Sequence, residues 1–268
     1  MPSFDKEYFN LGYLDTLSYK DTFVHRLDPR IKLVTTFIFI LFVVSFPKYE
    51  ILKMLPFFFF PVFILSVGEI PLKFILKKLL IASPFALFVG IFNPFFDTAA
   101  MYNFYGIPIS GGWVSYLSII IKFILTVTAA LLLVATTSFP GVCLALKKLK
   151  VPNVFVVQLL FLYRYMFVLT AETMRIIRAR NMRSFGKKGR GMKTLISIIG
   201  VLFVRTVERS ERIYQAMCSR GFDGEIRLLT SYKIGFVDIS FAITAITVFI
   251  IFRGYDVTKT LGELITKT

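Results

Sequence analysis

Five long apolar stretches are the feature of this sequence that most restricts its fold. A membrane-spanning helix needs about 20 mostly apolar residues, and somewhat fewer when anchoring side chains flank it. The stretches are 31–46, 51–67, 79–96, 113–139 and 234–252. Two further segments, 154–170 and 195–204, are apolar but interrupted or short. The sequence therefore predicts an all-α integral membrane protein with about five, and up to seven, transmembrane helices.

Composition excludes the soluble alternatives. Hydrophobic residues make up 56% of the chain and charged residues only 18%, against roughly 25% charged in soluble domains. His25 is the single histidine, so a histidine-rich metal site or a histidine-based catalytic triad cannot be built from this chain. Cys143 and Cys218 lack metal-binding spacing, and both are predicted to be buried small side chains. We expect no cofactor and no metal bound by the chain itself.

Most of the positive charge lies in one region. Residues 142–233 hold 18 Lys/Arg and 5 Asp/Glu, which is +13 of the total of +16. Apolar stretches bound this region, so the positive-inside rule explains its charge better than nucleic acid binding does. The loop 97–112 has no Lys or Arg and is predicted to lie outside. The predicted parts are a cytoplasmic N-terminal segment (1–30), transmembrane helices (31–139), a cytoplasmic region (140–233), and a last transmembrane helix with its tail (234–268).

The cytoplasmic region contains two amphipathic helices of similar design. The first, 162–183, has a mostly apolar stripe that ends at Arg180. The second, 202–220, has a similar stripe that ends at Arg220. The stripe residues are Leu162, Met166, Leu169, Thr173 and Ile177 in the first helix, and Leu202, Thr206, Ser210, Ile213 and Met217 in the second. Acidic residues lie among the arginines at helical spacing, which predicts ion pairing.

Each helix ends in a triplet that consists of a small residue, an arginine, and a small or polar residue. The triplets are Ala179-Arg180-Asn181 and Ser219-Arg220-Gly221. Gly221 suits a helix C-terminus, where a positive φ is needed, and the arginines complement the helix dipole. For one triplet alone, capping and solubility are a sufficient explanation. Two arginines, each emerging from an apolar stripe, instead suit docking into grooves that carry buried carboxylates, as in a mechanical coupler.

Three other features have both a structural and a functional interpretation. Pro84 and Pro94 predict kinks within the stretch 79–96, or a gating hinge. Asp238 lies inside the last apolar stretch, where it is a functional candidate, a snorkelling side chain or a partner of Lys233. In the segment 27–30, Asp28 and Pro29 predict the start of a helix, with Arg30 and Lys32 at the headgroups. A contact of this segment with a partner subunit is the alternative.

The sequence resembles the T components of energy-coupling-factor (ECF) ABC transporters, and is most similar to the CbiQ-like branch that serves cobalt and nickel uptake. The resemblance runs from about residue 13 to residue 224. Besides the two arginine triplets, its markers are VHRLDPRIKL (24–33), IPLKFILKKLLIASPFALFVGIFNPFF (70–96), YGIPISGGW (105–113), ATTSFPGVCLALKKLKVP (135–152) and YRYMFVLTAETMR (163–175).

The resemblance implies a non-catalytic scaffold in a prokaryotic cytoplasmic membrane. Its long coupling helices would insert Arg180 and Arg220 into two cytoplasmic ABC ATPase subunits, with Ala179, Ser219 and Gly221 as their small neighbours. ATP would be bound by those ATPases. Its membrane part would hold a substrate-binding S component, CbiM-like or NikM-like. The first triplet has Asn181 where the family typically has Gly; Asn tolerates the left-handed backbone expected there.

Two other function classes remain as alternatives, together with a T component that serves a vitamin-type S component. A membrane enzyme acting on lipid phosphates would use the arginine cluster, but the sequence shows no Dx2–4D metal pair at the end of a span. A self-sufficient channel or carrier would need polar residues in several spans. The motif GKKGRG (186–191) is not a Walker A motif, so the chain itself is not expected to hydrolyse ATP.

Overall fold

The computed structural model describes residues 16–96, 100–104, 107–183, 191–226 and 234–255. Within these residues the regular structure is helical apart from one short β-hairpin, so the predicted all-α membrane fold is confirmed with that addition. The chain divides into two compact units. Unit 1 is Met1–Tyr8 with Leu146–Ser231, and unit 2 is Phe9–Ala145 with Tyr232–Thr268. The predicted four-part division concerns the sides of the membrane, which these units do not address.

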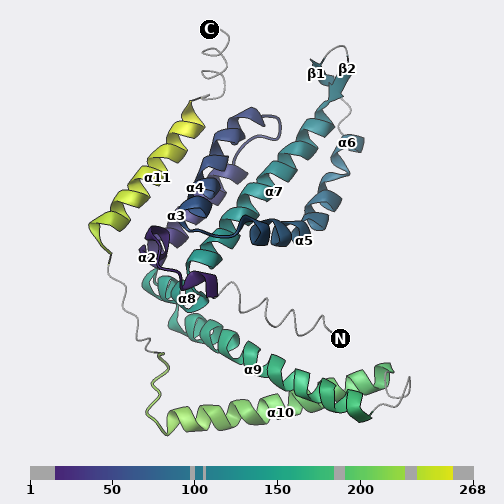
Figure 1. Ribbon diagram of the computed structural model, residues 1–268, viewed down its shortest axis with the longest axis vertical. Helices are drawn as coiled ribbons and strands as arrows, with labels where there is room; N and C mark the ends of the chain where they lie inside the picture. The colour runs from purple at the N-terminus through teal and green to yellow at the C-terminus, as the bar shows by residue number, and fades with distance from the viewer. Residues whose placement is uncertain (1–15, 97–99, 105–106, 184–190, 227–233, 256–268) are drawn as a thin grey trace. The chain divides into compact units, whose positions relative to one another are not determined.

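Unit 2 contains most of the helices and the hairpin (Figure 1). Its helices are α2 (Phe23–Arg26), α3 (Pro29–Val44), the 3-10 helix η1 (Leu52–Phe58), α4 (Phe59–Val67), α5 (Leu72–Gly90), α6 (Asn93–Phe96), α7 (Gly111–Thr136), most of α8 (Phe139–Lys148), and α11 (Phe236–Gly254). The antiparallel strands β1 (Ala100–Phe104) and β2 (Ile107–Ser110) lead directly into α7. Helix α7 packs against both α3 and α5, and α3 also packs against α11.

Unit 1 is built from two long helices. Helix α9 spans Asn153–Arg183 and α10 spans Met192–Cys218, and α10 turns back and crosses α9 (Figure 1). Both are longer at their N-terminal ends than the amphipathic segments 162–183 and 202–220 predicted from the sequence. The apolar segment 154–170 is therefore the first half of α9, and 195–204 belongs to the first half of α10.

Three helices in the described part of the chain are long and apolar enough to cross a bilayer, namely α7, α9 and α11. Leu52–Val67 is a shorter apolar helical segment, and α3 has 16 residues. The stretch 79–96, expected to form one span, is divided in two. Pro84 lies inside α5, whereas Pro94 lies in the separate short helix α6. All five predicted stretches are thus largely helical, and the number that cross the membrane remains a prediction.

Phenylalanines form the core of unit 2 where α3, η1, α4 and α11 meet. Phe39, Phe57 and Phe249 are each at most 1% exposed. The ring centroid of Phe39 lies 4.7 Å from that of Phe60 and 5.4 Å from that of Phe249. The rings of Phe60 and Phe249 meet edge to face at 5.1 Å. Tilted and edge contacts of this kind are the favourable arrangements for aromatic pairs, and α7 adds Leu132 to the same cluster.

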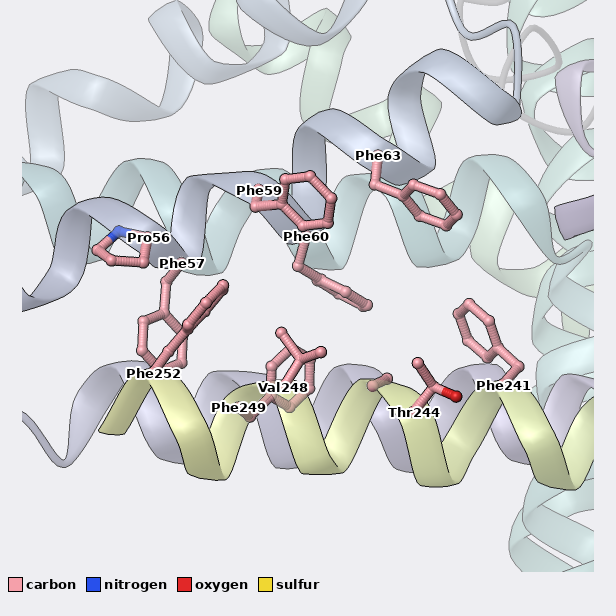
Figure 2. Close-up of a pocket in the computed structure, with 11 residues that line it drawn as sticks. Pro56, Phe57, Phe59, Phe60, Phe63, Phe241, Thr244, Val248, Phe249 and Phe252 are labelled. Atoms are coloured by element: carbon pink, nitrogen blue, oxygen red, sulfur yellow. The ribbon is translucent and has the colours of Figure 1, made fainter. Parts of the chain in front are cut away.

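An apolar crevice of about 180 Å³ lies beside this core, between η1 and α4 on one side and α11 on the other (Figure 2). Figure 2 shows Phe57 and Phe252 near one end and Phe63 and Phe241 near the other. Thr244 supplies the one side-chain hydroxyl among the 11 residues that line the crevice. A wall of this composition matches the hydrocarbon surroundings expected for α11 in a bilayer.

The first turn of α3 is capped as the sequence predicts. Asp28 is the N-cap, its Oδ1 accepts a hydrogen bond from the N–H of Arg30 at 2.8 Å, and Pro29 occupies the first helical position. The prediction for Lys32 is wrong, because its side chain is only 5% exposed and is buried in unit 2. Its ammonium donates to the carbonyl oxygen of Thr136 at 2.8 Å, which provides the hydrogen bond that a buried cation requires.

Asp238 is buried and hydrogen-bonded to the backbone. It is 8% exposed, and its two carboxylate oxygens accept hydrogen bonds from the N–H groups of Asp28 and Gly235, both at 2.8 Å. These bonds explain how a carboxylate is retained at the start of an apolar helix, since charged acceptors form the stronger class of hydrogen bond. Of the three interpretations that the sequence left open for Asp238, snorkelling is therefore wrong. Lys233, the expected partner, lies outside the described residues.

His25 predicts a pH dependence of stability. Burial first, and the neighbouring Lys32 ammonium second, lower the pKa of His25 below its usual value of 6.5. The folded state thus disfavours the imidazolium, and this contribution is complete above pH 6.5 and lost as the pH falls through the lowered folded pKa. We expect the melting temperature to drop by a few degrees between pH 7.5 and pH 5.

The substitution His25→Gln tests this origin, because the chain has one histidine. The variant should lose part of the acid-dependent decrease, while its melting temperature at pH 7.5 changes little. Differential scanning fluorimetry in mild detergent across the pH range is a suitable measurement. Identical pH profiles for the variant and the wild type would show that His25 does not carry the effect.

Candidate functional site

The first arginine triplet lies in the last turns of α9. Ala179, Arg180 and Asn181 are all helical, and the helix ends at Arg183. The apolar stripe predicted for this helix lines one shallow groove of about 480 Å³, which is formed by α9 residues from Leu162 to Ile177. The stripe leads toward Arg180 as the spacing predicted. The left-handed backbone expected at Asn181 is wrong, because the helix continues through it.

Arg180 lines a basic pocket of about 550 Å³ between the end of α9 and the start of α10. Arg175 and Arg183 of α9 and Arg205 of α10 also line it, and Glu172 is the one acid among its lining residues. The Glu172 carboxylate lies 3.4 Å from a nitrogen of Arg205 and 3.8 Å from a nitrogen of Arg175. Four guanidinium groups and one carboxylate leave an excess of positive charge, which suits an acidic partner.

The second arginine triplet, 219–221, follows the end of α10. Gly221 has a φ of 78°, so the positive φ predicted for this position is confirmed. Its N–H donates to the carbonyl three residues back at 3.0 Å, and the N–H of Phe222 donates to the carbonyl of Met217 at 3.1 Å. This pair of bonds is the Schellman motif. Arg220 stands exposed immediately before the turn.

The surface beside Arg220 differs from the surface around Arg180. A groove of about 630 Å³ separates the first half of α9 from the last half of α10. Aromatic and apolar side chains dominate its lining, including Phe161 and Tyr165 of α9, Tyr214 and Met217 of α10, and Phe222. The first triplet therefore contributes to a cationic pocket, whereas the second lies beside an apolar groove.

Polar contacts connect the two ends of unit 1. The Lys147 ammonium lies 3.3 Å from the Glu225 carboxylate, and the Asn153 side chain donates to the carbonyl of Gly224 at 3.2 Å. The predicted ion pairing at helical spacing is confirmed for Glu172 and Arg175, which are three residues apart, whereas Glu225 pairs with a lysine that is distant in sequence. Sequence reasoning missed the pocket itself, because Glu172 and Arg205 are 33 residues apart and no helical spacing relates them.

The candidate site offers little to a metal. In the described ranges, no group of three or more His, Cys, Asp or Glu side chains could hold an ion. Cys143 is buried as predicted, and burial raises the pKa of its thiol to about 11. The same prediction for Cys218 is wrong, because this side chain is exposed near the end of α10. The chemistry available at the two triplets is cationic recognition.

Comparison with known proteins identifies the family. The sequence model of CbiQ, described as "Cobalt transport protein", matches residues 20–232, which is most of the chain. The chain belongs to the CbiQ family. This match covers every described element from α2 to α10, including both arginine triplets.

Several curated relatives support the CbiQ assignment. The energy-coupling factor transporter transmembrane protein EcfT of Ruminiclostridium cellulolyticum is 28% identical, over 85% of this chain and 90% of that protein. The uncharacterized protein MJ1571 of Methanocaldococcus jannaschii is 29% identical, over 84% of this chain and 80% of that protein. The putative fused cobalt transport protein CbiMQ of Methanocorpusculum labreanum is 32% identical over 93 residues, which are 34% of this chain and 16% of that protein.

Proposed function

We propose that this CbiQ-family chain is the transmembrane coupling subunit of an ECF-type importer. Its Arg180 and Arg220 engage two cytoplasmic ABC ATPase subunits, and its membrane helices hold a substrate-binding S component. The chain binds no cofactor and catalyses no reaction itself; its ATPase partners bind and hydrolyse ATP. The N-terminus and the region 140–233 face the cytoplasm, in a prokaryotic plasma membrane.

The observation that carries this proposal is the pair of arginines at the ends of α9 and α10. Arg180 lies in a pocket with three further arginines, and Arg220 is exposed immediately before the hydrogen-bonded turn at Gly221. A guanidinium group pairs with carboxylates through two parallel hydrogen bonds, so each site suits an acidic groove on a partner. Two sites on two joined helices suit two copies of a partner or a heterodimer.

The cargo proposed is cobalt or nickel. The description of the matching family model and the name of the fused CbiMQ relative both refer to cobalt transport. In this proposal the metal ion binds to a CbiM-like or NikM-like S component rather than to this chain.

Purification of the tagged chain from its own host in mild detergent tests the proposal. We expect two ATPase subunits and a small membrane protein to co-purify, and the complex to carry cobalt or nickel measurable by elemental analysis. A vitamin bound to the small membrane protein would retain the coupling role and change the cargo. Recovery of the folded chain alone, under conditions that preserve a known membrane complex, would contradict the coupling function.

A further inference from the structure

We propose that the first turn of α3, residues 28–32, is the junction in unit 2 that anchors both ends of the segment containing α9 and α10. Movement of these helices then reaches unit 2 through this turn. What the movement accomplishes rests on the proposed function, whereas the anchoring does not. The proposal also gives a role to the segment 27–30, for which the sequence left a helix cap and a partner contact as alternatives.

Chain connectivity defines where the anchoring is needed. The chain passes from unit 2 to unit 1 after Ala145, inside α8, which begins three residues after α7 ends. It returns to unit 2 after Ser231, and α11 begins at Phe236. The end of α7, the body of α8 and the start of α11 are therefore the parts of unit 2 adjacent to these crossings. All three contact the first turn of α3.

Lys32 binds the end of α7, after which the chain leaves unit 2. Its ammonium donates to the carbonyl oxygen of Thr136, the last residue of α7, at 2.8 Å. A second contact reaches the carbonyl oxygen of His25 at 3.3 Å. Lys32 is 5% exposed and Thr136 is 3% exposed, so water competes little for these bonds. Helix carbonyls near a C-terminus lack intrahelical partners, and a buried cation is a strong substitute.

Helix α8 passes directly over the same turn. Gly141 of α8 is buried, and a Cβ placed there would lie 3.7 Å from the ring of Pro29. The same Cβ would lie 3.2 Å from a methyl group of Thr137 and 3.3 Å from the hydroxyl of Ser138. The absence of a side chain at Gly141 therefore lets α8 pack closely on the start of α3.

Asp238 binds at the start of α11, just after the chain has returned to unit 2. One carboxylate oxygen accepts the N–H of Asp28 and the other accepts the N–H of Gly235, each at 2.8 Å. The first bond joins residues 210 positions apart in the chain. Asp28 is 2% exposed, so this connection is buried like the one made by Lys32. A single carboxylate thus fixes both the start of α11 and the cap of α3.

These contacts place a lysine, a proline and an aspartate of one helical turn against three different elements. Buried charged groups that lose one partner leave the other uncompensated, so the turn resists separation from any of the three. Helix α3 continues from this turn into the phenylalanine core through Phe39. The turn therefore connects the parts of unit 2 next to both chain crossings with the packed interior of that unit.

Spin-label distance measurement on the detergent-solubilised full chain tests the anchoring. The exposed native Cys218 and an introduced cysteine at Ile250, which is 56% exposed, carry the labels, one in each unit. Cys143 should stay unlabelled near neutral pH because it is buried and the pKa of its thiol is raised to about 11. We expect Asp238→Ala and Lys32→Met each to broaden the distance distribution by about twofold.

Asp238→Asn and Asp21→Asn provide the matched comparison. The amide at position 238 would turn a donor toward a backbone N–H, so some broadening is expected even though size and shape are kept. Asp21 is an exposed carboxylate paired with Arg26, and its substitution should leave the distribution unchanged. Should Asp238→Ala not fold, the milder Asp238→Asn and the separate Lys32→Met decide the outcome. Unchanged widths in the folded variants would overturn the junction.

Uptake by the assembled complex is a further measurement. If residues 28–32 only stabilised the fold, uptake per assembled complex would not change. We expect Asp238→Asn and Lys32→Met to co-purify with wild-type amounts of ATPase subunits and to retain ATP hydrolysis. Uptake per assembled complex should fall by about tenfold, because small misplacements uncouple linked steps. Unchanged uptake per complex would also overturn the junction. If the wild-type chain recruits no ATPase, the proposed function fails, and the spin-label distances still decide the anchoring.

Discussion

Reversal of charge at both Arg180 and Arg220 is expected to abolish recovery of ATPase subunits with this chain and to abolish uptake. Removing one partner of a buried hydrogen-bonded charge pair costs about 2–5 kcal/mol, or roughly 30-fold to several thousand-fold in affinity. Arg180→Glu or Arg220→Glu alone should therefore reduce co-purified ATPase by at least about tenfold. The double variant should leave none detectable.

The two sites should respond differently to a conservative change. Arg180→Lys keeps the charge but loses the planar fork that pairs with two carboxylate oxygens. Because three further arginines line the pocket around Arg180, the pocket remains cationic in this variant. No other arginine lines the described groove beside Arg220. We therefore expect Arg220→Lys to lose more binding than Arg180→Lys.

Matched charge reversals control for nonspecific effects of the added acid. Arg178→Glu on α9 and Arg209→Glu on α10 change exposed arginines that line neither the basic pocket nor the apolar groove. Both should co-purify with ATPase subunits as the wild type does. Quantitative mass spectrometry of the purified complexes, with uptake measured in the same cells, gives the comparison. An intact complex with normal transport in the Arg180→Glu/Arg220→Glu variant would contradict the coupling role.

Truncation of Phe249 is expected to give the largest loss of stability. Its ring is 1% exposed and lies 5.1 Å from Phe60, 5.4 Å from Phe39 and 6.2 Å from Phe57. Phe249→Ala should cost about 3 kcal/mol, the lower end of the range for buried phenylalanine. The lower end applies because, in a bilayer, lost packing contributes more than transfer from water.

The neighbouring position supplies the control for Phe249. Ile250 is 56% exposed, so Ile250→Ala removes little packing and should change the free energy of unfolding by less than about 1 kcal/mol. Phe249→Leu keeps most of the volume and should fall between the two. Unfolding of the purified chain in mixed detergent micelles measures all three. Equal losses for Phe249→Ala and Ile250→Ala would show that the phenylalanine cluster is not the stabilising core.

Local patterns predicted much of the fold and part of the candidate site. Asp28 followed by Pro29 predicted the start of α3, and Gly221 after Arg220 predicted the positive φ that ends α10. Both features depend on a few adjacent residues, so a single segment contains the information they require. The apolar stripe of α9 was predictable for the same reason, since it repeats with the period of one helix.

Predictions failed where a side chain depends on a distant partner. Lys32 was expected at the headgroups, yet its ammonium binds the carbonyl of Thr136, 104 residues away. Asp238 had three interpretations from the sequence, as a functional candidate, a snorkelling side chain or a partner of Lys233, and none of them included its bond to the backbone of Asp28, 210 residues away. No helical period connects such positions, and a charged residue near the end of a span has the same local pattern whether it is exposed or buried.

The sequence by itself determined that this is a helical membrane protein of the CbiQ family with an arginine triplet near the end of each of two long helices. Apolar length, charge distribution and local caps are properties of single segments, and they act before the helices pack. The tertiary structure alone decided that four arginines share one pocket and that one turn of α3 holds three other elements. These arrangements arise because packing brings distant polar groups together, where burial leaves them no partner except one another.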